Sequence, residues 1–120
     1  MSHTVMIQTQ VRDAVAVAAA CRRLQWPSPR EGVHRLFSGE VTGLGVQLPD
    51  WRYPVVCDLA QGTLKYDHFG GRWGNPGHLD IFQQVYAVEK ASLEARKRGQ
   101  SVAEQPLPDG SIRLSIQVAD

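Results

Sequence analysis

The stretch that decides the fold is Ser111-Ile112-Arg113-Leu114-Ser115-Ile116-Gln117-Val118, in which polar and apolar residues alternate without a break. A period of two is the pattern of a β-strand, because successive side chains of a strand point to opposite faces. Asp109-Gly110 precedes this stretch and favours a tight turn. The sequence therefore predicts an antiparallel hairpin over residues 101–118, with one face toward a core and the other toward water.

The first part of the chain predicts a strand followed by a helix. Residues 5–11 alternate in the same way and are rich in β-branched side chains. Asp13 is then a natural N-cap, because its carboxylate can accept hydrogen bonds from the N–H groups of a first helical turn. The helix predicted over residues 14–25 is rich in alanine and ends before Pro27, which lacks a backbone donor.

The middle of the chain predicts four more strands and a second helix. The strands are expected at residues 33–37, 41–48, 55–59 and 63–66, and the helix at 78–98. Strands grouped between two helices favour an α+β fold, here one domain of residues 1–120 with a mainly antiparallel sheet and both helices on one face. The order resembles an elaborated ferredoxin-like layout, a βαββαβ core with extra strands. Gly43 and Gly45 share one face of their strand, which indicates the close approach of a neighbour or a bulge.

The composition is that of a globular protein with balanced charge. The net charge is +1, which gives no reason to expect a nucleic-acid or membrane partner. Arg96-Lys97-Arg98 is interpreted as a solvated helix end that complements the helix dipole. There is no run of 18 apolar residues, and the segment that starts at Met1 lacks the features of a signal peptide. A cytoplasmic location is therefore expected.

The residue types used in catalysis do not form a recognisable set. Cys21 and Cys57 lie far apart in apolar segments and are expected to be buried rather than reactive. An enzyme hypothesis would rest on Asp58, His68 or Cys57, and the protein is more readily explained as a non-enzyme. The histidines, His3 included, show no metal-ligand spacing, so no metal site and no cofactor is predicted.

The glycine-rich segment from Asp67 to Gly77 is the main candidate site. The residues that could bind a ligand there are His68, Arg72, Trp73, Asn75 and His78. They precede a predicted helix N-terminus, where backbone N–H groups attract anions. The segment matches neither a dinucleotide-binding nor a P-loop motif. The competing interpretation is a surface loop pinned to the core by Phe69 and Trp73.

Aromatic residues in loops offer a second candidate surface. Trp26, Trp51, Tyr53 and Trp73 all lie in or beside predicted loops. Such residues either fill the core or mark a protein-binding surface, and the sequence leaves both alternatives open. The edge strands of an open sheet provide another docking mode, by strand addition to a partner or to a second copy of the chain.

An ordered set of residues at the two ends of the chain carries a family resemblance. The set comprises Met1-Ser2-His3, Ile7-Gln8-Thr9-Gln10-Val11, Asp13, Tyr86-Ala87, Gly99, Val102, Glu104 and Asp109-Gly110-Ser111-Ile112-Arg113-Leu114. It resembles the hypothetical chloroplast reading frame 35 family of plastid and cyanobacterial genomes, which also occurs in other bacteria as a domain of unknown function. Residues 26–76 take no part in the resemblance. It implies no established catalytic residues, and it implies an AAA-type ATPase as a partner.

The sequence thus predicts a non-catalytic interaction or adaptor protein. The chain has no Walker A loop, so an ATPase would be a partner and not this chain. The alternative is a small-ligand or anion-binding domain that uses residues 67–78. Whether the chain forms a homo-oligomer is left open.

Overall fold

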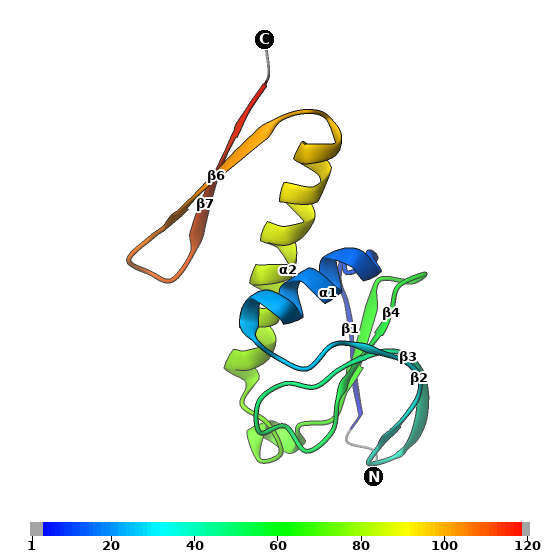
Figure 1. Cartoon of the computed structure of the whole chain (residues 1–120). Helices are drawn as coiled ribbons and strands as arrows, with labels where there is room; N and C mark the ends of the chain where they lie inside the picture. Colours follow the sequence, from blue (N-terminus) through cyan, green and yellow to red (C-terminus); the bar gives the residue numbers. More distant parts are fainter. Residues whose placement is uncertain (1–3, 119–120) are drawn as a thin grey trace.

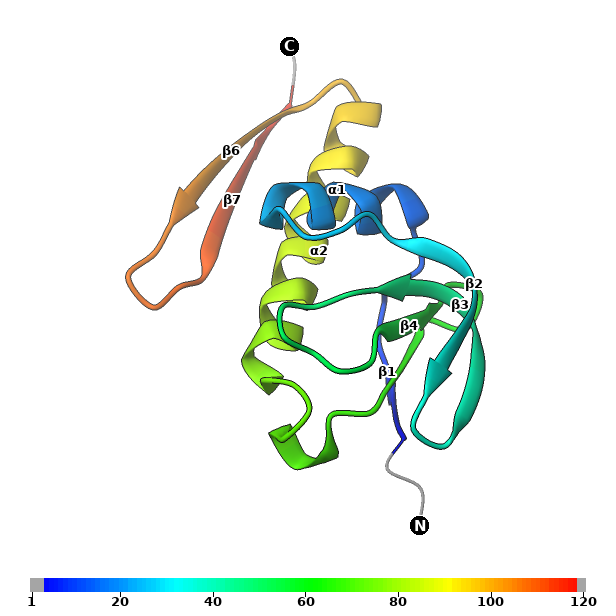
Figure 2. The same cartoon turned by 60° about the horizontal axis from the view of Figure 1, so that its bottom comes forward.

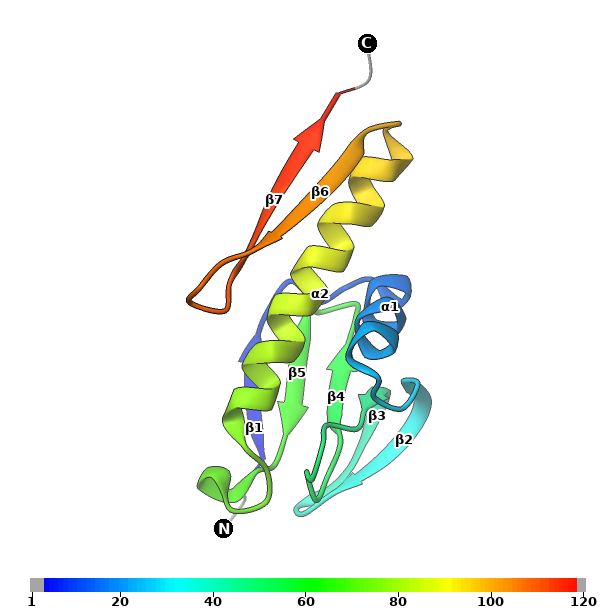
Figure 3. The ribbon, with the colours of Figure 1, turned by 60° about the vertical axis from the view of Figure 1, so that its left-hand side comes forward.

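The computed structural model describes residues 4–118, in which five strands form one antiparallel sheet (Figure 3). These strands are β1 (Val5–Gln8), β2 (Arg30–Leu36), β3 (Gly39–Val46), β4 (Val55–Asp58) and β5 (Thr63–Tyr66). Their order across the sheet is β1-β5-β4-β3-β2, so β1 and β2 form the two edges. The predicted strands are confirmed, with bounds that differ by a few residues.

Helix α1 (Ala14–Leu24) begins and ends where the sequence indicates. The Asp13 carboxylate accepts hydrogen bonds from the backbone N–H groups of Val15 (2.9 Å) and Ala16 (3.3 Å), which confirms the predicted N-cap. Gln25 then adopts a left-handed conformation, with φ of 60°, and donates its N–H to the Arg22 carbonyl. The helix therefore ends at Leu24, three residues before Pro27.

Helix α2 (Pro76–Lys97) is twice as long and carries caps at both ends. Asn75 caps its start, and Pro76 occupies the first turn, where a missing N–H costs nothing. Gly99 follows its end with φ of 71°, a left-handed conformation that glycine adopts without steric cost. Both helices lie on the same face of the five-stranded sheet and against each other (Figure 1).

The α+β class, with a mainly antiparallel sheet and two helices on one face, is confirmed. Figure 2 shows α1 crossing α2, with the strands of the main sheet to one side of α2. The finer expectation of a ferredoxin-like core is not confirmed. In that layout the first strand would lie inside the sheet, whereas β1 forms an edge and pairs with β5. The strands predicted at the end of the chain form a separate two-stranded sheet.

The main core lies between the helices and one face of the sheet. The strand register places Leu44 beside Cys57, and Cys57 beside Leu64, so these three buried side chains form a row across the sheet. Helix α1 covers the row with fully buried side chains from Ala16, Val17, Ala20 and Cys21. Alanine side chains are short, so this face of the helix can pack closely on the strands.

The opposite face of the sheet explains the two glycines of β3. A Cβ atom on Gly45 would overlap the His34 ring, and one on Gly43 would meet the Cys57 carbonyl oxygen at 2.7 Å. His34 Nε2 lies 2.8 Å from the Arg30 carbonyl oxygen and 3.2 Å from that of Gly43. Carbonyl oxygens only accept hydrogen bonds, so this nitrogen carries the proton. The predicted close approach at Gly43 and Gly45 is thus confirmed.

A single tyrosine joins α2 to the segment that connects β1 to α1. The Tyr86 hydroxyl oxygen accepts hydrogen bonds from the backbone N–H groups of Arg12 and Asp13, each at 3.1 Å. Lys90 reinforces this joint, because its ammonium group bonds to Asp13 (3.0 Å) and to Glu94 (2.9 Å). The bond from Lys90 is the main reason why the pKa of Asp13 lies below its usual value. The bonds to Glu94 and Asp13 raise the pKa of Lys90.

The C-terminal hairpin consists of β6 (Ser101–Pro106) and β7 (Ile112–Gln117), which we call the arm. The Asp109 carboxylate accepts hydrogen bonds from the Ser111 N–H (2.9 Å) and hydroxyl (2.5 Å), which tightens the predicted turn. The expectation that one face of the arm belongs to a core is wrong. Ile116 is 47% exposed and Val118 is 73% exposed, because the arm lies outside the layer that the helices cover.

The arm lies alongside α2 and makes the molecule elongated (Figure 1). The guanidinium group of Arg23 forms two bonds to the Glu104 carboxylate, at 2.5 and 3.0 Å. The Gln84 side chain donates to the Gly110 carbonyl (2.8 Å) and ties the turn of the arm to α2. The molecule measures 57 × 31 × 23 Å, with a radius of gyration of 15.4 Å. A compact domain of this length would have about 14 Å.

Within residues 4–118, no helix is both long enough and apolar enough to cross a membrane.

Candidate functional site

The segment between β5 and α2 forms a tight turn instead of an open loop. Phe69, Gly70 and Gly71 have positive φ angles of 48°, 61° and 95°. The His68 carbonyl oxygen accepts hydrogen bonds from the N–H groups of Gly71 and Trp73, each at 2.9 Å. Glycine tolerates this conformation, but at Phe69 it costs about 1–2 kcal/mol. Contacts of the Phe69 ring must offset that cost.

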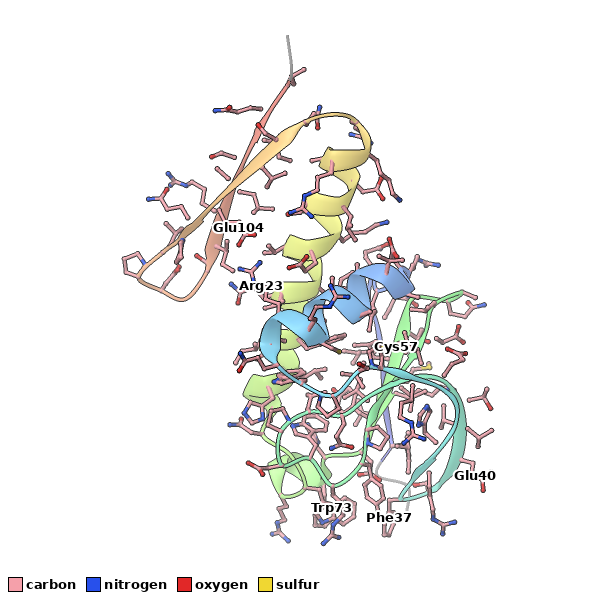
Figure 4. The ribbon with its side chains drawn as sticks, viewed as in Figure 1. Arg23, Phe37, Glu40, Cys57, Trp73 and Glu104 are labelled. Carbon is pink, nitrogen blue, oxygen red and sulfur yellow. The ribbon has the colours of Figure 1, made fainter. Side chains whose placement is uncertain are left out.

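The Phe69 ring stacks on Trp73, and further rings gather around this pair. The centroid of the Trp73 ring lies 4.6 Å from that of Phe69, 5.1 Å from Phe37 and 5.7 Å from Tyr53. Figure 4 shows Phe37 and Trp73 side by side at the end of the molecule that lies away from the Arg23–Glu104 pair. Three segments distant in the sequence therefore meet in one aromatic cluster.

Two arginines complete this surface. The Arg52 guanidinium carbon lies 5.0 Å from the centre of the Trp73 ring, and that of Arg72 lies 5.2 Å from the Phe69 ring. Both distances are in the range of cation–π attraction. We call the six residues Phe37, Arg52, Tyr53, Phe69, Arg72 and Trp73 the aromatic face. Both arginines are exposed, and Phe37 keeps 49% of its surface in contact with solvent.

Only two of the five predicted site residues belong to this face. Arg72 and Trp73 belong to the aromatic face. His68 lies behind it, with its ring 5.1 Å from Tyr66 and 5.7 Å from Trp51. Asn75 has a structural role, because its side-chain oxygen accepts a hydrogen bond from the Gly77 N–H (2.9 Å) at the start of α2. The structure therefore does not bring all five together around one point.

His78 lies in the first turn of α2, and its Nδ1 atom is buried without a hydrogen-bond partner. The same holds for His68 Nδ1 and for both carboxylate oxygens of Asp67, which is fully buried. These groups do not converge on a metal site. Across residues 4–118, no three His, Cys, Asp or Glu side chains are placed to hold a metal ion. His3 lies outside the described residues.

The three tryptophans have different roles. Trp51 fills the core at 4% exposure, and its indole N–H donates to the Asn75 carbonyl (3.1 Å). Its ring occupies the space that a Cβ atom of Gly74 would need, so Gly74 lets the segment pass close to the core. Trp26 is partly buried and stacks on Phe82. Only Trp73 belongs to the aromatic face.

Neither Cys57 nor Asp58 has the surroundings of a catalytic group. Burial raises the pKa of the Cys57 thiol to about 12, so the reactive thiolate is not populated near neutral pH. Burial also raises the pKa of the Cys21 thiol. The Asp58 side chain accepts a hydrogen bond from the Gln61 N–H (3.2 Å) within a turn. The predicted burial of both cysteines is confirmed.

Three hollows of the described surface lie away from residues 67–78. One, of about 590 Å³, lies beside β2 and is lined by Arg30, His34 and Gln47 among others. A second, of about 320 Å³, lies between residues 9–11 and α2, with Tyr86 and Lys90 in its wall. A third, of about 290 Å³, is lined by residues of β3 and β4. The aromatic face is thus an outward surface and not the wall of any of these hollows.

Sequence reasoning did not identify Phe37 and Arg52 as members of the site. The apolar pattern predicts a strand over residues 33–37, yet Phe37 lies in the turn between β2 and β3. A large apolar residue next to Ser38-Gly39 was the available signal, because a turn seldom reaches the main core. Arg52 stands between two aromatic residues, Trp51 and Tyr53, which was the second signal.

No protein-family model, curated protein or solved structure matches this chain. The family resemblance described above therefore stays a prediction.

Proposed function

We propose that this chain is a non-catalytic adaptor that binds a partner protein through the aromatic face. The observation that carries the proposal is the arrangement around Trp73, with Phe69 stacked on it and an arginine over each ring. Tryptophan, tyrosine and arginine are the residues that most often dominate the binding energy of protein interfaces. Here they occur together at the surface.

The backbone of this region supports a binding role as well. The left-handed conformation of Phe69 is unfavourable for a phenylalanine, and the tight turn holds its ring against Trp73. Strained backbone tends to occur at binding and catalytic sites, where geometry is fixed in advance of binding. A surface organised in this way loses little conformational entropy when a partner docks.

The chemistry of the aromatic face favours a protein partner with acidic side chains. Arg52 and Arg72 are exposed and bring two positive charges to the rim of the rings. Opposite charge on the partner would speed association and make the binding sensitive to salt. An AAA-type ATPase is the partner that the family resemblance implies. The two buried free cysteines suit a reducing compartment, and we propose the cytoplasm as the place of action.

A small-ligand or anion site at residues 67–78 is the alternative, and it has less support. Ligand sites usually enclose most of their ligand, whereas none of the three hollows described above is lined by residues 67–78. Asn75 already occupies one N–H group at the start of α2. A thermal-shift screen with phosphates, nucleotides and metabolites tests this alternative, which requires a rise in melting temperature that His78→Ala removes.

The adaptor proposal is tested by charge reversal on the aromatic face. The double variant Arg52→Glu/Arg72→Glu should lose a partner that the wild-type chain captures from cells that produce it. The matched control, Arg22→Glu/Arg98→Glu, makes the same change of charge at two exposed arginines elsewhere and should retain it. Circular dichroism should show that both variants are folded.

A captured partner is then purified and titrated against the three proteins. Phe37→Ser, which removes an exposed ring from the aromatic face, should also weaken binding, by about ten-fold or more for a dominant interface residue. Equal affinity of the wild type and the double variant would rule out the aromatic face as the binding surface.

A further inference from the structure

The arm is a two-stranded sheet that pairs with no other strand among the described residues. Its register runs from Ser101 opposite Gln117 to Pro106 opposite Ile112. An isolated two-stranded hairpin is only marginally stable in water, and further strands or a packed face are needed for stability. The salt bridge from Arg23 and the bond from Gln84 tie the arm to the helices, but its apolar face stays partly exposed.

The hydrogen bonds of the turn decide which backbone groups face outward from the arm. The Leu107 N–H donates to the Ser111 carbonyl at 2.8 Å, so this pair is a hydrogen-bonded pair of the ladder. Such pairs alternate along an antiparallel ladder. The backbone groups of Ile112, Leu114 and Ile116 in β7 therefore point away from β6. By the same alternation, Val102, Glu104 and Pro106 supply the outer edge of β6.

The two outer edges differ in their readiness to pair with another strand. The edge of β6 includes Pro106, which has no N–H to donate. Its central residue, Glu104, carries a charge that Arg23 already binds, and this bond lowers the pKa of Glu104. The edge of β7 has neither proline nor lysine, the residues with which proteins usually protect exposed strands. Edge strand β2 of the main sheet is protected by charges, among them Arg30 and Glu31.

We propose that β7 pairs with β7 of a second copy of this chain, so that two arms form one four-stranded sheet. An antiparallel pairing of identical strands requires a two-fold axis perpendicular to the sheet. With the axis at Leu114, this residue lies opposite Leu114 of the partner subunit. Ile112 then lies opposite Ile116 of the partner subunit. Three hydrogen-bonded pairs, with about two bonds each, connect the copies.

Self-complementarity of the strand favours a second copy over an unrelated protein. In this register apolar residues meet apolar residues on one face. On the other face the one charged residue of β7, Arg113, lies opposite Ser115 of the partner subunit, so no like charges meet. The same pairing of β6 about Glu104 would place two carboxylates opposite each other.

The proposed dimer also joins the partly exposed apolar stripes of two arms. The stripe comprises Val102, Pro106, Ile112, Leu114 and Ile116, which share the face of Glu104 because they alternate in register with it. This is the face that Glu104 turns toward Arg23. A two-fold axis perpendicular to the sheet places both bodies on this same face. The stripes of the two arms then become continuous on this face.

The dimer goes beyond the proposed adaptor function and uses the opposite end of the molecule. Figure 4 places Trp73 and Phe37 at the end remote from the arm. A dimer formed through the arms would leave both aromatic faces accessible and so present two binding surfaces to a partner assembly.

Sedimentation velocity over a range of concentrations tests the dimer with a pair of matched proline variants. Ile116→Pro removes only an outward N–H from β7, and Val102→Pro removes the corresponding N–H from β6, directly opposite in the register. The wild type and Val102→Pro should dimerise, and Ile116→Pro should stay monomeric. A wild type that is monomeric at every concentration would overturn the proposal, as would a dimer that Ile116→Pro leaves intact.

Loss of the dimer in both proline variants would point to damage to the arm itself. Two charge substitutions at Ser115 then test whether the two β7 strands pair in the proposed register. Ser115→Glu places a carboxylate opposite Arg113 of the partner subunit and should tighten the dimer by at least about two-fold. Ser115→Arg places like charges opposite each other and should weaken it by a similar factor. Both substitutions lie on the exposed polar face. Equal dimerisation of these two variants would rule out the proposed register.

Discussion

Replacement of Tyr86 by phenylalanine should destabilise the protein by about 1–2 kcal/mol. The hydroxyl oxygen of Tyr86 is the acceptor for two backbone N–H groups, those of Arg12 and Asp13, each at 3.1 Å. Phenylalanine keeps the ring, which is 4% exposed, so the hydrophobic contribution of the core is unchanged. A buried donor that loses its partner costs about 1–3 kcal/mol. The lower part of this range applies because these N–H groups are only partly buried.

Urea denaturation followed by tryptophan fluorescence measures this change in the free energy of unfolding. The midpoint should fall while the m-value stays constant, because the surface exposed on unfolding is the same. The melting temperature should fall by roughly 3–6 °C per kcal/mol for a domain of this length. Tyr53→Phe is the control, because no hydrogen bond of the Tyr53 hydroxyl is found in the described structure, and it should change the free energy by less than about 0.5 kcal/mol. Equal stability of the two variants would refute the role assigned to the Tyr86 hydroxyl.

Three further predictions concern the sheet, the core thiol and the joint between the helices. Gly45→Ala should destabilise the protein by about 1–3 kcal/mol because the new methyl group meets the His34 ring. In a double-mutant cycle, His34→Ala should recover part of this loss, and additive effects of the two substitutions would contradict the contact between residue 45 and His34. Cys57, whose pKa is raised to about 12, should react with a thiol reagent at pH 8 only after unfolding in urea, and rapid labelling of the native protein would show that the thiol is accessible. The bond from Lys90 lowers the pKa of Asp13, so Asp13 contributes stability that is present above its unfolded pKa of 3.8 and is lost as the pH falls through its folded pKa. Lys90→Met should therefore flatten the rise in the free energy of unfolding between about pH 2 and pH 5. An unchanged pH profile would argue against the Asp13–Lys90 ion pair.

Much of the secondary structure follows from local patterns. Asp13 lies directly before a run of alanines, and it caps α1 because a carboxylate at that position satisfies N–H groups that the helix leaves unpaired. Asp109-Gly110 marks the turn of the arm for a similar reason, since the aspartate side chain bonds two residues ahead and glycine accepts positive φ. These interactions join residues only a few positions apart, so they can be predicted from the sequence alone.

The candidate site could be predicted only in part. The segment 67–78 contributes Arg72 and Trp73, and its abundance of glycine correctly indicated unusual backbone angles. The same segment also contributes Asn75, which caps a helix. The sequence shows which residue types could bind a ligand, but it does not show that the Asn75 side-chain oxygen already accepts a hydrogen bond from the Gly77 N–H. Phe37, in the turn between β2 and β3, and Arg52, in the loop between β3 and β4, join the site because the fold brings both loops to Trp73, which is more than 20 residues away from each of them in the sequence.

The sequence by itself determined the elements, their caps and turns, the α+β class and the burial of both cysteines. Each of these depends on the period of apolar residues or on bonds between near neighbours. The tertiary structure alone decided the strand order, with β1 at an edge beside β5, and the position of the arm. Alternation in Ile112, Leu114 and Ile116 shows that these side chains share a face, but it carries no information about what covers that face. Burial depends on contacts between distant segments, and in this chain the helices cover the five-stranded sheet instead of the arm.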